Sequence, residues 1–288
     1  MTEQQPLVSV VIPCFNHAQF IQETIQSVID QDYQNIELII IDDGSKDKSV
    51  EVIQEMVPAC EKRFTRFEFR YRPNKGLSAT LNEALKWCEG VYFAPLASDD
   101  LIKTYKTSIQ VTYLENNPDS IGVFGGICIF KNNGTTREVV RRNAKYRFTD
   151  ILIQKHNLPA PTQLLRMEAI KKIGGYKEGL IIEDWSTWLF LTENGGTLDY
   201  IATIFAYYRR HSDNLSGKFE VMHKGRMQII NLYKDNINYN KALAMVLLTN
   251  AYEIKKNDFG KSFKLILNSI RAYPFCIFSK LFILIVIR

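Results

Sequence analysis

The chain has 288 residues, of which 46% are hydrophobic and 23% charged, so it can bury a large core. This composition excludes a wholly disordered chain, which needs few apolar residues and a high net charge. The five cysteines are scattered and form no CxxC pair, which argues against a disulfide framework or a zinc site and fits a reducing cytosol. The opening residues, "MTEQQPLVS", have neither the basic nor the apolar region of a signal peptide, and we expect a cytoplasmic protein.

The net charge of +5 is unevenly distributed along the chain. Residues 217–288 contain 12 Lys and Arg but 4 Asp and Glu, a net charge of +8, whereas residues 1–216 have a net charge of −3. A basic tail on a mildly acidic body indicates an anionic partner for the tail. A solvated helical face is the alternative interpretation.

The first hundred residues alternate between strand and helix patterns. The segments "LVSVVIPCFN", "IELIIIDD", "RFEFRYRPN" and "VYFAPLA" are predicted strands. The second is almost continuously apolar, which is typical of a parallel strand covered on both faces, and the third alternates and is expected nearer an edge. Amphipathic helices are predicted between the strands, with Ser45 capping the second helix and Gly90 as the C′ residue of the third.

This alternation predicts a doubly wound α/β fold with a mostly parallel, Rossmann-like sheet. From about residue 121 the pattern loosens into a glycine-rich strand ("IGVFGGICIF"), a helix ("EDWSTWLFL") and another strand ("TIFAYYRRH"). Residues beyond 217 are predicted to be helical. Ligands bind beyond the carboxyl ends of the strands in such sheets, so we look for the site there.

Two pairs of adjacent aspartates follow predicted strands, Asp42-Asp43 in "DDGS" and Asp99-Asp100 in "SDD". Both pairs are expected on one rim of the sheet, where their oxygens suit a hard cation such as magnesium or manganese. Such a cation would offset their repulsion and bridge a diphosphate. The alternative is structural, because an aspartate of either pair could cap a helix or form an Asx-turn.

A third acidic pair, Glu183-Asp184, comes at the start of a predicted helix that contains Trp185 and Trp188. Asp184 could be a helix N-cap, which is a structural role. It could instead be a general base that deprotonates an incoming hydroxyl. In the second interpretation the tryptophans would offer a stacking platform for a sugar ring.

Other phosphate-binding and nucleophilic motifs are missing from the sequence. There is no GxxxxGK[ST] loop, no glycine motif that leads into a helix for a dinucleotide, and no Ser nucleophile elbow. His17, His156 and His223 are interpreted as surface or packing residues. His211 differs, because it ends an aromatic strand and enters a polar loop.

Taken together, these segments resemble the family 2 glycosyltransferases of GT-A fold, over about residues 7–216. The resemblance rests on six segments in the family's order: "VSVVIPCFN", "SVIDQDYQNIELIIIDDGSKDKS", "RPNKGLSATLNEAL", "GVYFAPLASDDL", "EDWSTWLFL" and "YYRRHSDNLS". It implies an inverting transfer of a hexose or N-acetylhexosamine from a nucleoside diphosphate sugar, usually a UDP-sugar, to a hydroxyl. The acceptor is expected to be a lipid-linked oligosaccharide in the synthesis of O-antigen, capsule or another surface polysaccharide.

The resemblance also implies which residues contact the nucleotide sugar. Pro13 and Phe15 would frame the base, Asp43 would accept a hydrogen bond from it, and Lys75 would approach the phosphates. The full set of expected donor contacts is Pro13, Phe15, Asp42, Asp43, Asn74, Lys75, Gly76, Ser98 and Asp99.

The same resemblance implies a Mn²⁺ or Mg²⁺ cofactor held by Asp99, Asp100 and His211. Asp184 would be the catalytic base, with Glu183 orienting it or contacting the acceptor. Two positions depart from the family pattern: Ala97 stands where many members have another aspartate, and Leu81 where many have arginine. A basic group near the phosphates would then come from Lys75 or Arg72.

We therefore expect a nucleotide-sugar-binding half over residues 1–120, an acceptor-binding and catalytic half over residues 121–216, and a basic helical extension over residues 217–288. Two alternatives are a non-catalytic nucleotide-sugar-binding or scaffold protein of the same fold and a nucleotidyltransferase. A nucleotidyltransferase is expected to have a glycine-rich, basic loop after the first strand, where this chain has "PCFNHAQ". No nucleic-acid partner is expected.

The C-terminal residues form an apolar and basic segment. In "KSFKLILNSIRAY" the apolar residues fall on one helical face, and the last apolar stretch, residues 275–287, is interrupted by Lys280. That stretch is shorter than the roughly 20 residues of a spanning helix. An interfacial helix on the anionic inner leaflet of the membrane is one interpretation, and a helix packed on the body or on a homodimer partner is the other.

Overall fold

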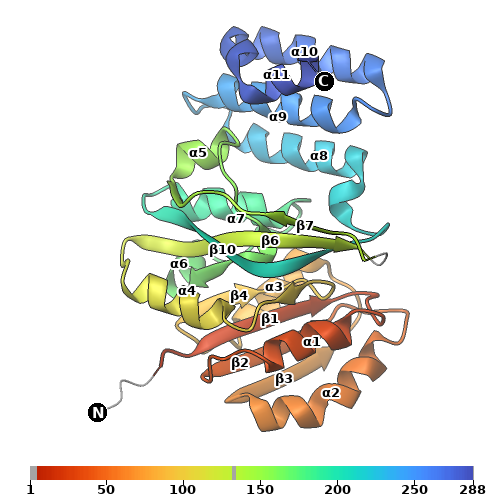
Figure 1. Cartoon of the computed structure of the whole chain (residues 1–288), viewed down its shortest axis with the longest axis vertical. Coiled ribbons are helices and arrows are strands. Elements are labelled where there is room, and N and C mark those ends of the chain that lie inside the picture. The colour runs from red at the N-terminus through yellow and green to blue at the C-terminus, as the bar shows by residue number, and fades with distance from the viewer. Residues whose placement is uncertain (1–4, 132–133, 288) are drawn as a thin grey trace. The chain divides into compact units, whose positions relative to one another are not determined.

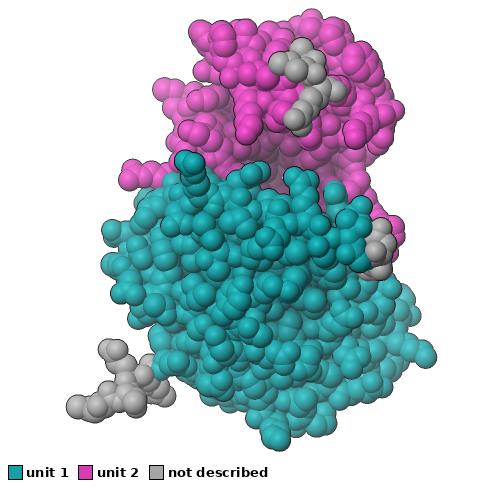
Figure 2. Space-filling model, viewed as in Figure 1, with its two compact units in different colours: residues 1–146, 157–178, 190–211 teal, residues 147–156, 179–189, 212–288 magenta. Residues whose placement is uncertain are grey.

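The computed structural model describes residues 5–131 and 134–287, and the chain divides into two compact units (Figures 1 and 2). Unit 1 consists of residues 1–146, 157–178 and 190–211, and unit 2 of residues 147–156, 179–189 and 212–288. The division cuts across the three segments predicted from the sequence, which were defined by function and stay a prediction.

Unit 1 is built on one mixed sheet whose strand order is β3-β2-β1-β4-β9-β6-β10-β5. Its first four strands are β1 (Val8–Cys14), β2 (Ile36–Asp42), β3 (Arg66–Tyr71) and β4 (Tyr92–Pro95). They alternate with the helices α1 (Ile21–Ile29), α2 (Ser49–Arg63), α3 (Leu77–Leu85) and α4 (Lys106–Glu115). β1 pairs in parallel with β2 and β4, and β2 with β3. The predicted doubly wound α/β arrangement is confirmed.

The burial of each strand explains its place in the sheet. Every residue of β2 is buried, as its continuous apolar run predicts for a strand covered on both faces. β3 is half-exposed and lies at the end of the strand order, where its alternating pattern placed it.

The second half of the sheet sets the direction of β10. It contains β5 (Leu101–Ile102), β6 (Ser120–Lys131), β7 (Thr136–Val139), β8 (Ala144–Tyr146), β9 (Leu164–Arg166) and β10 (Thr197–Arg210), with α6 (Met167–Lys172) and the 3₁₀ turn η1 (Ala160–Thr162) beside it. β9 is antiparallel to both β4 and β6, and β6 is parallel to β10. β10 therefore runs in the direction of β1–β4, and its carboxyl end lies on the same rim as theirs.

Unit 2 is helical, which confirms the prediction for the residues beyond 217. It contains α5 (Phe148–Leu152), most of α7 (Glu183–Thr192), α8 (Phe219–Ile230), α9 (Tyr239–Ile254), α10 (Phe259–Ala272) and α11 (Lys280–Ile287), with the 3₁₀ turns η2 (Leu215–Gly217), η3 (Asn231–Tyr233) and η4 (Pro274–Phe278). Buried residues of α9, α10, η4 and α11 share one apolar core. Within the described ranges, none of the helices has the length and apolarity needed to cross a membrane.

Three predicted helix ends are wrong. α2 begins at Ser49, and Ser45 instead donates its hydroxyl hydrogen bond to the Asp42 carboxylate, at 2.6 Å. α3 ends at Leu85, and the glycine at position 90 is needed because a Cβ there would lie 2.5 Å from Ser9 Oγ. α7 begins at Glu183, so Asp184 lies in its first turn rather than at an N-cap.

Candidate active site

The loop after β2 is closed by its own first carboxylate. Asp42 Oδ1 accepts hydrogen bonds from the backbone N–H groups of Gly44 at 3.1 Å and Ser45 at 2.8 Å, and the Asp42 side chain is fully buried. This is the Asx-turn foreseen as the structural alternative. Asp42 therefore shapes the "DDGS" loop.

Asp43 joins this loop to the "NKG" loop that follows β3. Its two carboxylate oxygens accept hydrogen bonds from the backbone N–H groups of Lys75, at 2.8 Å, and Gly76, at 2.9 Å. Asn74 donates its side-chain amide to the Asp43 carbonyl at 2.8 Å. Gly44 has φ = 77°, and a Cβ there would lie 2.7 Å from the Asn74 nitrogen, so only glycine allows the loops to approach this closely. The structure thus brings four of the predicted donor residues together.

Arg72 is the basic side chain that lies against the "DDGS" and "NKG" loops. Its guanidinium donates to the carboxylate of Asp43, to Glu83 at 2.7 Å and to the hydroxyl of Thr80 at 2.9 Å. These bonds hold Arg72 against the two loops, whereas Lys75 is exposed. Of the two basic residues expected near the phosphates, Lys75 is the one with an accessible side chain.

The loop after β1 is fastened to the loop after β2. The backbone N–H of Asn16 donates to Ser45 Oγ at 2.8 Å, and that of His17 donates to Ser49 Oγ at 3.0 Å. Phe15 is exposed at this rim, and Pro13 is the last residue but one of β1. The predicted base-framing residues therefore lie beside the "DDGS" loop.

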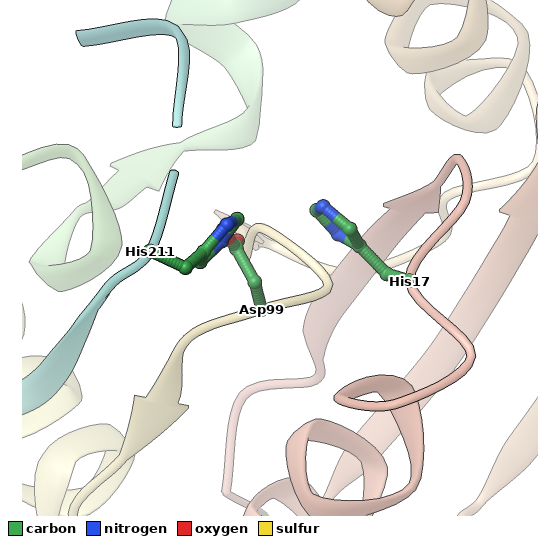
Figure 3. A group of neighbouring side chains, drawn as sticks. All are labelled: His17, Asp99 and His211. Carbon is green, nitrogen blue, oxygen red and sulfur yellow. The ribbon is translucent and has the colours of Figure 1, made fainter. Parts of the chain in front are cut away.

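Two histidines and one aspartate meet at the carboxyl ends of β1, β4 and β10 (Figure 3). His211 Nε2 lies 2.9 Å from Asp99 Oδ2. His17 Nδ1 is hydrogen-bonded to Ser98 Oγ at 2.7 Å. In the part of the chain that the structure describes, His17, Asp99 and His211 are the group of His, Cys, Asp or Glu side chains whose ligand atoms lie within 4.8 Å of one another.

The spacing and chemistry of these three side chains fit one divalent cation. Ligand atoms about 2.1 Å from a shared ion lie about 3 Å apart when adjacent and about 4 Å apart when opposite, so a small inward movement would complete the site. Two imidazole nitrogens with one carboxylate form a donor set that suits transition metals better than magnesium. The hydrogen bond between His17 Nδ1 and Ser98 Oγ fixes the ring of His17, and in a metal-binding histidine this second ring nitrogen would be the donor.

Asp100 lies outside this group. Its Oδ1 accepts the backbone N–H of Arg209 at 2.9 Å. Burial, with a contribution from the charge of Asp99, raises the pKa of Asp100 well above its usual range. The structure therefore brings Asp99 and His211 together, but not Asp100, and adds His17.

Arg209 holds the "SDD" loop against the end of β10. Its side chain is buried, donates to the Asp99 carbonyl at 2.9 Å and forms an ion pair with Glu23 at 2.5 Å. The guanidinium also lies 4.8 Å from the ring of Phe20 and 4.6 Å from that of Phe130, distances typical of cation–π contacts. His211 follows two residues later and packs on the same Phe20 ring, at 4.8 Å. Arg209 is thus a positioning residue for Asp99 and His211.

The third acidic pair belongs to unit 2. Burial, together with the charge of Asp184, raises the pKa of Glu183 to about 8. Burial also raises the pKa of Asp184. At neutral pH this pair therefore retains a proton, and Glu183 is the residue expected to hold it.

The predicted sugar-stacking role of the two tryptophans is wrong. Trp185 and Trp188 are 5% and 4% exposed, so neither ring offers a free face. Trp185 donates its indole N–H to the Ile151 carbonyl at 3.1 Å, and Trp188 packs edge-on against His156. They are core residues of unit 2.

Sequence reasoning missed His17 and Arg209. His17 lies just beyond the end of β1, and that position was a usable signal, because Asp43 and Asp99 also follow strands. Arg209 lies near the end of β10, and His211 follows just past the last residue of that strand. Their partners, by contrast, are distant in sequence.

Comparison with known proteins identifies the class of the chain. Residues 9–174 match the family model "Glycosyl transferase family 2", and the chain belongs to this family. A Haemophilus influenzae protein described as an uncharacterized glycosyltransferase is 28% identical over 89% of this chain and 83% of its own. A Bacillus subtilis protein, described as the putative teichuronic acid biosynthesis glycosyltransferase TuaG, is 28% identical over 75% of this chain and 84% of its own. By contrast, the chain spans 36% of a Rickettsia felis relative.

Solved structures show the same fold. Staphylococcus aureus TarS 1-349 in complex with UDP-GlcNAc superposes with a TM-score of 0.63 and 18% identity, over 93% of this chain and 82% of TarS 1-349. The mannosyltransferase PcManGT from Pyrobaculum calidifontis, in complex with GDP-Man and Mn²⁺, gives a TM-score of 0.60 and 13% identity over 98% of this chain and 84% of its own. The expected GT-A fold is confirmed.

Replacing Arg209 tests the positioning role. We expect Arg209→Met to lower the free energy of unfolding by about 2 kcal/mol, because it removes a buried cation from two hydrogen bonds and two rings. The affinity for Mn²⁺, measured by calorimetry, should fall as well, since Asp99 and His211 lose their common support. Arg210→Met is the matched control, because Arg210 is the exposed neighbour on the other strand face. Equal Mn²⁺ affinities for the two variants would contradict the assignment.

The raised pKa of Glu183 predicts how stability depends on pH. Below about pH 4.5 the carboxyl is protonated in both the folded and unfolded states. As the pH rises toward about 8 the unfolded state releases the proton first, so the free energy of unfolding falls. Chemical denaturation at pH 5 and pH 8 should show Glu183→Gln gaining more than about 1 kcal/mol over the wild type at the higher pH. A gain at pH 5 instead would reverse the sign and refute the assignment.

Proposed function

We propose that this family 2 glycosyltransferase transfers a hexose or N-acetylhexosamine, with inversion, from a UDP-sugar to a hydroxyl of a lipid-linked oligosaccharide. The observation that supports it best is the convergence of three strand-end loops and His211 on one rim of unit 1. TuaG, named for teichuronic acid biosynthesis, and TarS, which has been solved with UDP-GlcNAc, support a UDP-sugar donor and a surface polysaccharide product.

The donor nucleotide would be held by the loops after β1, β2 and β3. Asp43 is buried and already orders the backbone of the "NKG" loop, so a base bound there meets a preformed acceptor. Lys75 would meet the phosphates, and Ser98 and Asp99 would lie at the ribose. Preorganised groups of this kind cost little rearrangement when the donor binds.

A Mn²⁺ or Mg²⁺ ion would be held by His17, Asp99 and His211, and we favour Mn²⁺ because of the two imidazoles. When bound, such an ion takes up negative charge on the leaving diphosphate. Asp99 and His211 are both nearly buried, which strengthens their interaction with a bound charge. Asp100 would support the site through the backbone of Arg209.

Asp184 would be the general base. The acceptor oxygen would form its bond to the anomeric carbon while the bond from that carbon to the diphosphate oxygen breaks, and UDP would leave. The acceptor proton would pass to the ionised carboxylate of Asp184. Glu183, protonated below about pH 8, would donate a hydrogen bond to the acceptor or to Asp184. A single displacement needs no covalent nucleophile and inverts the anomeric centre.

The acceptor sets the proposed location. A lipid-linked oligosaccharide would place the enzyme in the cytoplasm, peripheral to the inner face of the cell membrane. A homodimer is compatible with this location. A screen of UDP release across donor sugars, with and without Mn²⁺, would identify the donor, and no release with any donor would favour a non-catalytic binding protein.

Asp184→Asn tests the base. The change keeps the size of the side chain and removes its basicity, so transfer should fall roughly 10²–10⁴-fold while UDP binding by calorimetry stays within a factor of about two. Glu193→Gln, an exposed acidic residue just beyond α7, is the control and should behave like the wild type. Wild-type turnover by Asp184→Asn would refute the assignment.

His17→Gln tests the third ligand. Removing one imidazole should weaken Mn²⁺ binding at least about tenfold, measured by electron paramagnetic resonance without any sugar donor. His223→Gln changes a histidine of unit 2 and should leave Mn²⁺ binding unaltered. If His17→Gln binds Mn²⁺ as tightly as the wild type, the ion is held without His17.

A further inference from the structure

The apolar face of α10 is wider than the core that it covers. At 3.6 residues per turn, the side chains from Leu265 through Ile266 and Phe263 to Leu267 span roughly 200° of the helix circumference. Leu265 and the small residues Ser262 and Ser269 are buried. The inner half of this face therefore packs into unit 2.

The outer half of the face is exposed. Phe259, Phe263 and Leu267 follow one another at intervals of four residues and are 69%, 52% and 40% exposed. The same exposure continues into η4, where Phe275 and Phe278 are 67% and 75% exposed. We call these five residues the α10–η4 face. Single exposed apolar residues are common on proteins, but several exposed large apolar side chains on one helix and on the turn that follows it indicate an interaction surface.

Cations border this face. Lys264 and Arg271 fall next to Leu267 around the helix, and both are exposed, as is Lys280 after η4. Residues 252–287 contain six basic and two acidic residues. The two acidic residues are already bonded: Glu253 pairs with Arg226 at 2.6 Å, and Asp258 accepts the backbone N–H of Lys261 at 2.8 Å. Lys261 is itself paired with Glu220 of α8, at 2.5 Å, so the positive charge of the border comes from Lys264, Arg271 and Lys280.

We propose that the α10–η4 face binds the surface of an anionic phospholipid membrane, with its aromatic side chains inserted at the headgroup level. Aromatic residues flanked by Lys and Arg are the pattern of helices that lie in the interface. The cations would meet lipid phosphates, each adding to the affinity. α11 has eight residues, so this helix is too short to span a bilayer.

Charge decides against a second copy of the chain as the occupant. A symmetric dimer through this face would bring the same patch of both copies together, and so Lys264 and Arg271 of one copy toward those of the other. Like charges facing each other across an interface oppose association. An anionic lipid surface has the complementary charge.

The inference names the surface responsible for the membrane location proposed above, but it does not depend on glycosyl transfer, because membrane binding needs neither donor nor metal. Its failure would leave the transfer reaction untouched, and an inactive enzyme could still bind vesicles. Together the two proposals would bring the protein to the layer where a lipid-linked acceptor resides.

Vesicle flotation of the full chain tests the proposal. At about 0.1 M salt the wild type should float with phosphatidylcholine vesicles that contain about one-third phosphatidylglycerol, and much less with phosphatidylcholine alone. The double variant Lys264→Gln/Arg271→Gln should partition roughly thirtyfold less, from two lost cations. The variant Phe263→Ser/Phe278→Ser should partition at least about tenfold less, because two inserted rings are removed.

Matched controls distinguish vesicle binding through the α10–η4 face from non-specific binding. Ile237→Ser removes an apolar side chain that is 96% exposed elsewhere in unit 2, and Lys234→Gln removes an exposed lysine. Both should float like the wild type, and far-ultraviolet circular dichroism should show that all variants are folded. Equal flotation of face and control variants would overturn the proposal. So would a wild type that does not float but forms a dimer in sedimentation velocity that the face variants lose.

Discussion

The rim of unit 1 where its parallel strands end depends on one electrostatic constraint: a buried carboxylate must accept hydrogen bonds from neighbouring groups. The aspartates that end β2 and follow β4 are at most 7% exposed, and burial of an unpaired charge is too costly to persist. Each is met by a neighbouring segment, through backbone N–H groups of the "DDGS" and "NKG" loops, the Arg209 backbone and the His211 ring. The acidic residues proposed to serve the donor are therefore also the residues that order the loops around it.

Because the same aspartates order the loops and are proposed to contact the donor, part of the site could be predicted from the sequence. Continuous apolar runs such as β2 specify buried parallel strands, and the direction of those strands puts their terminal aspartates on one rim. For Asp42 the two interpretations, a structural Asx-turn and a residue of the donor site, are compatible. The carboxylate that forms the Asx-turn also fixes the loop that is proposed to bind the donor. The sequence places His17 just after a strand but does not show its role, and it gives no signal for Arg209. Both roles depend on partners in Ser98, Asp99 and Phe20 that only tertiary structure brings close. The prediction for the tryptophans of α7 was wrong because an aromatic residue next to a carboxylate gives the same sequence pattern whether its ring is buried or exposed.

The histidine pair gives a physical meaning to the alanine at position 97. At this position, where the resemblance to the family leads to the expectation of another aspartate, the chain has no charge. The imidazole of His17, from the loop after β1, lies beside Asp99 and His211. Replacing an anionic ligand by a neutral one lowers the electrostatic attraction for any divalent cation. It shifts the preference toward metals that bind nitrogen well. The proposed cation site would thus rely on ligand type and geometry more than on accumulated charge.

The proposed roles divide between the two units. The residues assigned to the nucleotide and the cation all belong to unit 1, whereas the proposed base and the α10–η4 face belong to unit 2. In these proposals donor recognition would depend on loops ordered by buried carboxylates. Access to a lipid-linked acceptor would depend on helices that expose aromatic and basic side chains to the membrane. A rigid donor site suits a small ligand whose groups are fixed. An amphipathic surface suits a lipid-linked ligand that is confined to an interface, because confinement in two dimensions raises its local concentration without any specific contact.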